Sequence, residues 1–207
     1  DSVGQFYYNS TSNAFKYVQP GGVAVGTWAS GGALNTARVS LRGSGTQTAG
    51  LAVGGSTSTV LANTELYNGS SWTEVNDLNT ARRNMGVAGT QTASIAGTGA
   101  GAPAPLSPSC ELWNGTSWTE VADMNTYRQS QSACGTSTSA LTAGGEPGNP
   151  TNAETWNGSS WTAIATISSG GITGMAGVSN SSALAISGVP GVRGVNVEQW
   201  NGSGWTE

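Results

Sequence analysis

The chain has 207 residues, only 9% of them charged, with 32 glycines and a formal net charge of −4. Its single lysine and its lack of a basic run give little attraction for a phosphate backbone, so we expect no nucleic-acid partner. No apolar run approaches the roughly 18 residues that cross a bilayer, so we expect no membrane insertion.

The chain opens with an aromatic segment, GQFYYNSTSNAFKYV at residues 4–18, which predicts a β-hairpin with a polar turn at residues 9–13. Gln-Pro-Gly-Gly at residues 19–22 then breaks the chain. We therefore expect two parts. Residues 1–22 form a hairpin and linker that serve as an attachment element, and residues 23–207 form a repeat domain.

Four near-copies of one decamer mark the repeat domain, and ELWNGTSWTE at residues 111–120 is one of them. The decamers begin 46, 43 and 44 residues apart, at Glu65, Glu111, Glu154 and Glu198. Such a period indicates an array of supersecondary units. Each decamer predicts a β-hairpin reversed at Asn-Gly, two residues that tolerate the positive φ of a tight turn. The turns also form Asn-X-Ser/Thr sequons, but their constancy favours a structural role over glycan attachment.

Four strands follow one another in each unit, and the second unit shows them most clearly. We expect strand a from Arg82 to residue 89, strand b at residues 92–97, strand c at residues 110–113 and strand d at residues 117–124. Four such sets fit between residues 38 and 207. Residues 28–34 align with strand d and supply a spare outer strand, which could replace or extend the short final one.

Side-chain size is graded along each unit and favours one architecture. Strands a and b consist largely of Ala, Gly, Ser and single aliphatic residues, whereas c and d carry the tryptophans. In a radial array the gap between sheets widens outward, so the outer strands need large residues. We therefore predict an all-β fold, a β-propeller of four-stranded blades with four blades favoured. A fifth remains open if the N-terminal hairpin or a neighbouring chain contributes strands. Trp72, Trp118 and Trp161 are expected to lie buried between blades.

The units resemble kelch repeats in several features. An Arg opens strand a, a glycine pair closes strand b, strand c carries an aromatic residue and strand d carries a Trp. The residues that show the first two features are Arg38, Arg82, Arg128, Gly54-Gly55 and Gly144-Gly145. The period is shorter than the usual kelch length of about 50, the second and fourth units lack the full glycine pair, and Gly171 stands where a fourth Arg is expected. The resemblance implies a divergent kelch-like propeller.

A second resemblance covers the whole chain. The N-terminal aromatic segment, WASGGALNTAR at residues 28–38 and GTQTAGLAVGG at residues 45–55 are similar to the kelch-like arrays of tail-fibre and related structural proteins of marine bacteriophages. This resemblance implies a virion or extracellular location and a role in recognition or decoration. The partners would be other virion proteins, bound through the N-terminal hairpin, and a host cell-surface glycan or protein. A homo-oligomer remains open.

Catalytic and metal chemistry is not expected. Kelch-like copper oxidases need histidine ligands, and the chain has no histidine. We therefore predict no enzyme activity, no catalytic residue, no metal site and no cofactor. The four repeated glutamates indicate scaffold, because buried charges must be paired and each glutamate can pair with a repeated arginine. For Cys110 and Cys134, two buried free thiols are favoured over a bridge.

Recognition is expected where the units differ. The segments between strands b and c, residues 56–64, 98–110, 146–153 and 189–197, vary in sequence and share a face with the d-to-a turns. The candidate ligand-binding residues on that face are Arg38, Arg82, Arg128, Asn35, Asn79, Asn125, Pro103, Pro105, Glu146 and Asn149. Alternatively, the arginines and asparagines close turns and pair with the glutamates.

The leading hypothesis for function is a non-catalytic phage virion protein, a tail fibre or related appendage, whose propeller mediates host-surface recognition through these variable loops. The alternatives are a purely structural decoration or spacer domain and, third, a kelch-type carbohydrate-active enzyme.

Overall fold

The computed structural model describes residues 6–9, 14–17, 30–101, 106–148, 150–168, 170–187 and 196–207. The chain divides into two compact units, Asp1–Gly31 and Gly32–Glu207. In the first unit β1 (Phe6–Asn9) pairs antiparallel with β2 (Ala14–Tyr17), which is the expected aromatic hairpin. The expected boundary after residue 22 lies outside the described residues.

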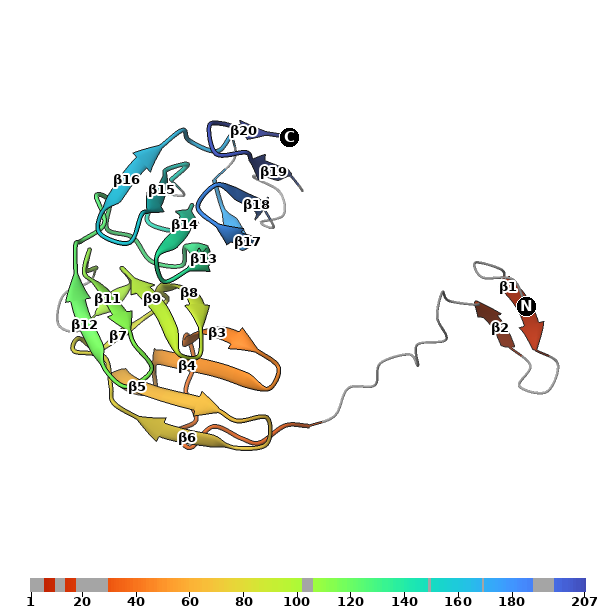
Figure 1. Ribbon diagram of the computed structural model, residues 1–207, viewed down its shortest axis with the longest axis horizontal. Coiled ribbons are helices and arrows are strands. Elements are labelled where there is room, and N and C mark those ends of the chain that lie inside the picture. Colours follow the sequence, from red (N-terminus) through yellow and green to blue (C-terminus); the bar gives the residue numbers. More distant parts are fainter. Residues whose placement is uncertain are drawn as a thin grey trace. The chain divides into compact units, whose positions relative to one another are not determined.

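The second unit contains four antiparallel sheets of four strands, which we number blades 1 to 4 in chain order (Figure 1). Blade 1 consists of β3 (Arg42–Thr46), β4 (Ala49–Ser56), β5 (Val60–Tyr67) and β6 (Trp72–Val75). Blade 2 consists of β8 (Gly86–Thr90), β9 (Ala93–Gly97), β11 (Cys110–Trp113) and β12 (Trp118–Val121). Blade 3 consists of β13 (Ser132–Thr136), β14 (Ser139–Ala143), β15 (Ala153–Trp156) and β16 (Trp161–Ile164). Blade 4 consists of β17 (Ile172–Ser179), β18 (Ser182–Ser187), β19 (Val197–Trp200) and β20 (Trp205–Thr206).

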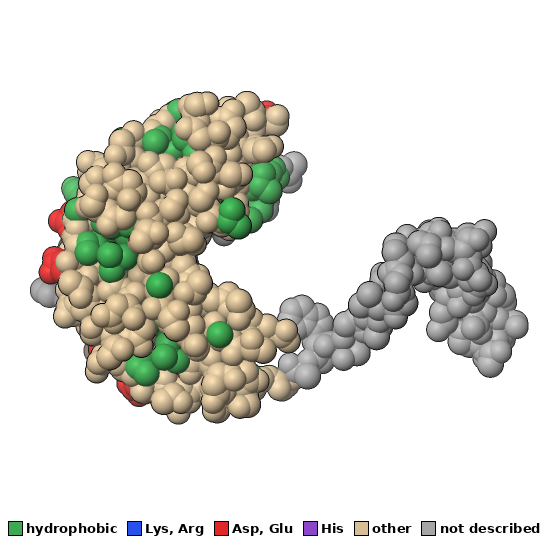
Figure 2. All heavy atoms as spheres, viewed as in Figure 1, with side chains coloured by type: hydrophobic (Ala, Val, Ile, Leu, Met, Phe, Trp, Pro, Cys, Tyr) green, Lys and Arg blue, Asp and Glu red, His purple; other side chains and the backbone are tan. Residues whose placement is uncertain are grey.

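The blades form a four-bladed β-propeller, as the graded side-chain sizes predict. The first strand of each blade is innermost, and consecutive inner strands contact one another, β3 with β8, β8 with β13 and β13 with β17. Within the second unit, the space-filling view shows a hollow between blade 1 and blade 4 (Figure 2). The arrangement is compatible with a kelch-like propeller.

Strand a begins later than the sequence predicts. In blade 2 it starts at Gly86, and Arg82 belongs instead to β7 (Arg82–Arg83), which pairs with β10 (Ala100–Gly101). The cause is Asn84, whose left-handed backbone (φ 53°) redirects the chain between the two strands. Ser40 and Ser130, two residues after the equivalent arginines, have the same conformation (φ 58° each).

Two other sequence expectations are wrong. The first b-to-c loop is far shorter than residues 56–64, because β4 runs to Ser56 and β5 begins at Val60, so that these two residues pair. The spare strand at residues 28–34 does not join blade 4, whose sheet order is β17-β18-β19-β20. Residues 30–34 lie in no strand, and residues 28 and 29 are outside the described residues.

Each blade presents two different faces to its neighbours. We call the face that carries the aromatic pair of the two outer strands the aromatic face, and the opposite one the back face. The aromatic face of each of blades 2 to 4 packs on the back face of the preceding blade. In the first of these interfaces Trp113 and Trp118 of blade 2 join one core with Leu51 and Val53 of blade 1. The hydrophobic core is therefore three successive blade interfaces.

The expectation that the d-strand tryptophans are buried between blades is confirmed for Trp118 and Trp161. For Trp72 it is wrong, since this indole is only half-buried. The reason is its place in the array: Trp72 lies on the aromatic face of blade 1, and no preceding blade in the described chain covers that face.

The Asn-Gly turns form as expected, but only Gly uses positive φ, for example Gly115 at 93°. Asn114 acts through its side chain instead. Its Oδ1 accepts hydrogen bonds from the backbone N–H groups of Thr116 and Ser117, both at 2.9 Å. This is an Asx turn, and the other three decamers repeat it.

Candidate functional site

One polar contact recurs where the chain enters a new blade, and blade 2 shows it in full. The Arg82 guanidinium forms an ion pair with the Glu111 carboxylate, and both side chains are buried. Asn79 donates to the same carboxylate through its backbone N–H and its Nδ2, at 2.8 Å each. The Nδ2 also donates to the carbonyl oxygen of Trp118 at 3.1 Å. We call this arrangement a clasp, because it fixes the link from blade 1 onto the two outer strands of blade 2.

The clasp is repeated at two other blades with the same residue types. Its members are Asn35, Arg38 and Glu65 at blade 1, and Asn125, Arg128 and Glu154 at blade 3. At blade 4, where Gly171 replaces the arginine, the backbone N–H of Ser168 donates to Glu198. Six of the candidate ligand-binding residues are thus members of clasps.

The electrostatics of the clasps explain why the three arginines do not form a positively charged binding site. The three guanidinium groups are buried against carboxylates and present no charge to a ligand. At Glu65 burial alone would raise the pKa, but the hydrogen bonds from Arg38 and Asn35 outweigh it and hold the pKa of this carboxyl below its ordinary value. Burial lowers the pKa of Arg128, an effect that the charge of Glu154 opposes. The arrangement matches the alternative expectation, in which these residues close turns and pair with glutamates.

The remaining candidate residues are not brought to a common site among the described residues. Glu146 is exposed, and its Oε2 lies 3.4 Å from the Nε2 of Gln129. Pro103, Pro105 and Asn149 lie outside the described residues.

The three left-handed residues after the arginines are linked around the propeller axis. The backbone N–H of Asn84 donates to the carbonyl oxygen of Ser40 at 2.9 Å, and that of Ser130 donates to the carbonyl oxygen of Asn84 at 2.7 Å. These two bonds join successive blade links near the axis. They also fix Ser130, and with it Gln131, at one end of a pocket between the inner strands.

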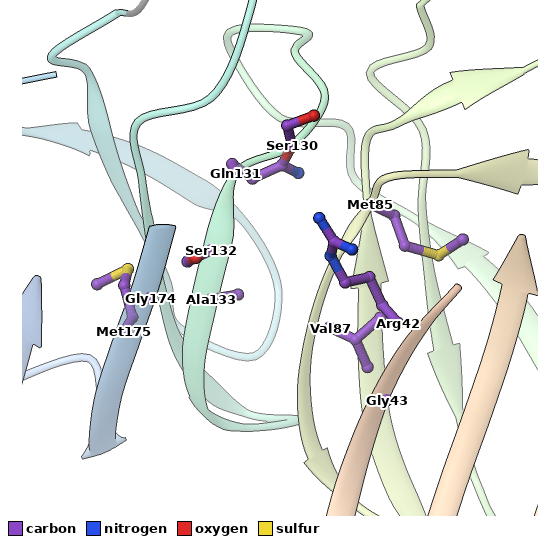
Figure 3. A pocket seen from close by; sticks show the side chains of 10 residues that line it. All are labelled: Arg42, Gly43, Met85, Val87, Ser130, Gln131, Ser132, Ala133, Gly174 and Met175. Carbon is purple, nitrogen blue, oxygen red and sulfur yellow. The ribbon is translucent and has the colours of Figure 1, made fainter. Parts of the chain in front are cut away.

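This axial pocket has a volume of about 350 Å³ and is lined by inner strands of all four blades (Figure 3). Met175 is an apolar residue of its lining, whereas Met85 and Val87, which also line it, belong to the core between blades 1 and 2. Its lining residues are Arg42, Gly43, Met85, Val87, Ser130, Gln131, Ser132, Ala133, Gly174 and Met175. A site at the axis is formed by residues of every blade, whereas a loop at the rim belongs to a single blade.

Arg42 supplies the charge of the axial pocket. Figure 3 shows its guanidinium group pointing toward the end where Ser130 and Gln131 lie. Its one hydrogen bond within the described chain is to the carbonyl oxygen of Leu41, at 3.3 Å, and no described carboxylate forms an ion pair with it. Burial lowers the pKa of Arg42, but an arginine remains charged at neutral pH. A half-buried cation without a counter-charge favours an anion beside it.

Gln131 supplies a second unsatisfied group. Its Nε2 donates to the carbonyl oxygen of Gly97 at 2.9 Å and to the hydroxyl of Thr98, which fixes the amide. The Oε1 of the same amide is buried and has no hydrogen-bond partner in the structure. Gly86 makes room for this amide, since a Cβ there would lie 3.2 Å from the Nε2. An unsatisfied buried acceptor costs about 1–3 kcal/mol of stability.

The lining of the pocket therefore includes a guanidinium group for an anion, two serines and the apolar residue Met175. The repeated residues do not indicate this pocket, because its charged residue occurs in one blade alone. Arg42 occupies a register position at which blades 2 and 3 have Gly86 and Ser132. A single charged residue at a position of otherwise small residues is the signal that would have found it.

The two cysteines are free and buried, as expected. Burial raises the pKa of both the Cys110 and the Cys134 thiol to about 11. Neither is therefore a thiolate nucleophile at neutral pH.

Comparisons with known proteins add no family: no protein-family model matches the chain, and no curated protein matches it. Among the described residues no group of three or more His, Cys, Asp or Glu side chains is placed to hold a metal ion. The same part of the chain contains no helix long and apolar enough to span a membrane.

Proposed function

We propose that this chain is a non-catalytic recognition module of a phage virion appendage, and that its propeller binds an acidic glycan of the host surface in the axial pocket. The observation that carries the proposal is Arg42, a half-buried cation that no described carboxylate neutralises. Two serines, Ser130 and Ser132, line the same pocket.

An acidic sugar fits this combination of groups. A guanidinium group binds a carboxylate through two parallel hydrogen bonds, which fixes orientation as well as charge. The hydroxyls of Ser130 and Ser132 can donate to or accept from the sugar hydroxyls. The volume of about 350 Å³ lies at the lower end of the range of about 300–1,000 Å³ that is usual for small-molecule sites. One or two sugar residues are the expected occupant.

A binding role is favoured over catalysis by the composition of the pocket. No carboxylate is among the described residues of its lining, and the chain has no histidine, so the two commonest general acids and bases are not offered by that lining. The placement on a virion rests on the resemblance of residues 28–38 and 45–55 to phage tail-fibre sequences. The fold supports it only in providing a rigid scaffold for recognition.

The second candidate function is a structural decoration or spacer of the appendage. The observation that favours it is the blade face at each end of the array that no described blade covers, since such faces suit assembly. The two roles are compatible in one protein, because the axial pocket and the outward faces of blades 1 and 4 use different residues.

Isothermal titration of the protein with glucuronate and with glucose tests the proposal. We expect binding of glucuronate, no measurable binding of glucose, and weakening of glucuronate binding with added salt. Arg42→Gln should weaken the binding by about tenfold or more, because it removes a charge-assisted hydrogen bond. Arg83→Gln is the matched control, since it removes the same charge from an exposed position on β7.

Equal affinity of the Arg42→Gln variant and the unaltered protein would place the acid site elsewhere. Failure of the unaltered protein to bind glucuronate, galacturonate and sialate would exclude the acidic-glycan proposal and leave the structural role.

A further inference from the structure

The back face of blade 4 exposes residues that are core in every other blade. Leu51, Ile95 and Leu141 occupy one register position on the second strands of blades 1 to 3, and they are 2%, 2% and 0% exposed. Leu184 occupies that position in blade 4 and is 39% exposed. The neighbours differ: a following blade covers the first three residues, and no described blade covers Leu184.

Two further apolar residues belong to the same uncovered face. Ile186 and Val197 pair across β18 and β19, and they are 39% and 46% exposed. Buried and exposed residues alternate strictly along β18, whereas β14 of blade 3 is buried on both faces from Ala140 onward. Beside these residues lies a hollow of about 440 Å³ lined in part by Val178 and Leu184. Figure 2 shows hydrophobic side chains at this margin of the array.

The opposite end of the array exposes the complementary face. Tyr67 and Trp72 form the aromatic pair of blade 1, with ring centroids 5.0 Å apart and planes at 37°. The pair Trp113 and Trp118 of blade 2 has nearly the same geometry, 5.3 Å and 40°, and is buried against the back face of blade 1. Tyr67 and Trp72 are only half-buried. Blade 1 therefore has a preformed aromatic face without the back face that covers its equivalents.

A polar contact across the interfaces is also left unmade at blade 1. In the turn between the first two strands, Gln91 of blade 2 donates from Nε2 to the carbonyl oxygen of Tyr67, on the preceding blade. Asn180 of blade 4 donates in the same way to the carbonyl oxygen of Trp156, at 2.9 Å. Gln47 occupies the equivalent turn position in blade 1 and is exposed. The carbonyl oxygen of Trp200 in blade 4 is the matching acceptor.

The clasp at blade 1 completes the pattern. Asn35 and Arg38 bind Glu65 as Asn79 and Arg82 bind Glu111 where blade 1 meets blade 2. The link that leads into blade 1 is thus held by the same contacts as the link into a blade that another blade precedes.

We propose that the back face of blade 4 binds the aromatic face of blade 1 of a second copy of this chain, in a fourth interface of the kind that joins the blades within one copy. Leu184 and Ile186 then pack on Tyr67 and Trp72 of the other copy. Val197 stands at the position of Thr64, which accepts a hydrogen bond from the indole N–H of Trp118, so Val197 meets the indole of Trp72. The amide of Gln47 donates to the carbonyl oxygen of Trp200.

Such a contact is head-to-tail, because each copy contributes a different surface, and it closes into a ring or extends into a chain of copies. This asymmetry gives a sharp test. A variant with a disabled back face keeps a working aromatic face, and a variant with a disabled aromatic face keeps a working back face. Neither associates with itself, but a mixture of the two forms a one-to-one complex.

The experiment is sedimentation velocity of the full chain over a wide range of concentration. The unaltered protein should associate with rising concentration, and Leu184→Glu should weaken association by about tenfold or more while folding normally, since Leu184 is exposed within one copy. Trp72→Glu disables the other face, and Gln47→Glu, at an exposed turn position, is the second variant there in case Trp72→Glu does not fold. Tyr127→Glu is the control, since Tyr127 is 60% exposed and lies in the link between blades 2 and 3.

We expect monomers from Leu184→Glu and from the aromatic-face variant, and a heterodimer when they are mixed. The Tyr127→Glu protein should associate as the unaltered protein does. A monomer at every concentration would mean that a different occupant covers blade 4, and would overturn the proposal. Failure of the mixture to associate would overturn it as well, because it would show a symmetric contact or none between these faces.

Discussion

Arg82 and Glu111 form an ion pair that is buried on both sides, and it joins the link between blades 1 and 2 to the third strand of blade 2. The same pair recurs at blades 1 and 3. A buried ion pair contributes little net stability compared with apolar residues of the same shape, but breaking it leaves an isolated buried charge. The clasp should therefore be sensitive to the loss of one partner.

Glu111→Gln should destabilise the protein by about 3–5 kcal/mol, because the guanidinium group of Arg82 stays buried without a counter-charge. The measurement is urea denaturation followed by tryptophan fluorescence. Glu120→Gln is the control, since Glu120 lies directly across from Glu111 in the register of β11 and β12 but is exposed. Equal stability of the two variants would mean that the ion pair is not what holds the link.

At acid pH the stability of the protein should depend on the ionisation of Glu65. Its hydrogen bonds hold the folded-state pKa below the ordinary value of 4.5, so its contribution to stability is fully present above that pH and is lost as the pH falls through the lower folded pKa. Melting temperatures of the unaltered protein and of Glu65→Gln, taken from neutral pH downward, should converge in that acid window. A constant difference between the two curves down to the most acid pH would contradict the assignment.

The two neighbouring d-strand tryptophans should differ in their contribution to folding. Trp118→Ala should cost about 3–5 kcal/mol, because the indole is buried between blades and leaves a cavity. Trp72→Ala should cost clearly less, because its indole is only half-buried. Paired thermal melts at a concentration where the protein is monomeric give the comparison. A larger loss for Trp72 would show that the aromatic face of blade 1 is core within a single copy.

The Asx turns can be tested at Asn114. Asn114→Ala removes the acceptor of two backbone N–H groups and should destabilise the protein by about 1–2 kcal/mol. Asn114→Asp keeps an acceptor oxygen at the same place and should restore most of that loss. Chemical denaturation of the three proteins measures both effects, and an equally large loss in the Asp variant would assign the effect to something other than the acceptor.

The thiols of Cys110 and Cys134 should be inert in the folded protein. Both are buried, and burial raises their pKa to about 11, so little thiolate is present at pH 8. Reaction with a colorimetric thiol reagent should be slow in buffer and rapid for both residues in denaturant. Rapid reaction of either thiol in buffer would show that its blade interface opens readily.

Much of this fold can be predicted because each unit repeats the same physical requirements. The Arg82–Glu111 pair, 29 residues apart, recurs at 27 residues in blade 1 and 26 in blade 3, and its formation follows from the need to neutralise buried charge. What the repeats do not show is where they end. Trp72 and Trp118 have the same sequence surroundings, and only the presence of a preceding blade decides that one is half-buried and the other buried.

The candidate site is harder to predict for the opposite reason. Arg42 occurs once, at a position where other blades have small residues, and its environment is made by strands that lie far apart in the sequence. The glycine pair that closes strand b is incomplete in the sequence of blade 2, and this is another such case. Thr98 adopts the left-handed backbone conformation there (φ 52°), and Gly99 with positive φ (118°) follows it. The hydroxyl of Thr98 accepts a hydrogen bond from the side-chain amide of Gln131.

The clasps also decide how the molecule responds to a pulling force. A pull on the chain before Asn35 is resisted first by the bonds of Asn35 and Arg38 to Glu65, across the outer strands of blade 1. The next link is protected behind the Arg82–Glu111 clasp, so the load reaches blade 2 only after blade 1 has been peeled away. The array should therefore extend in separate steps of about one blade each, and work is absorbed at every step.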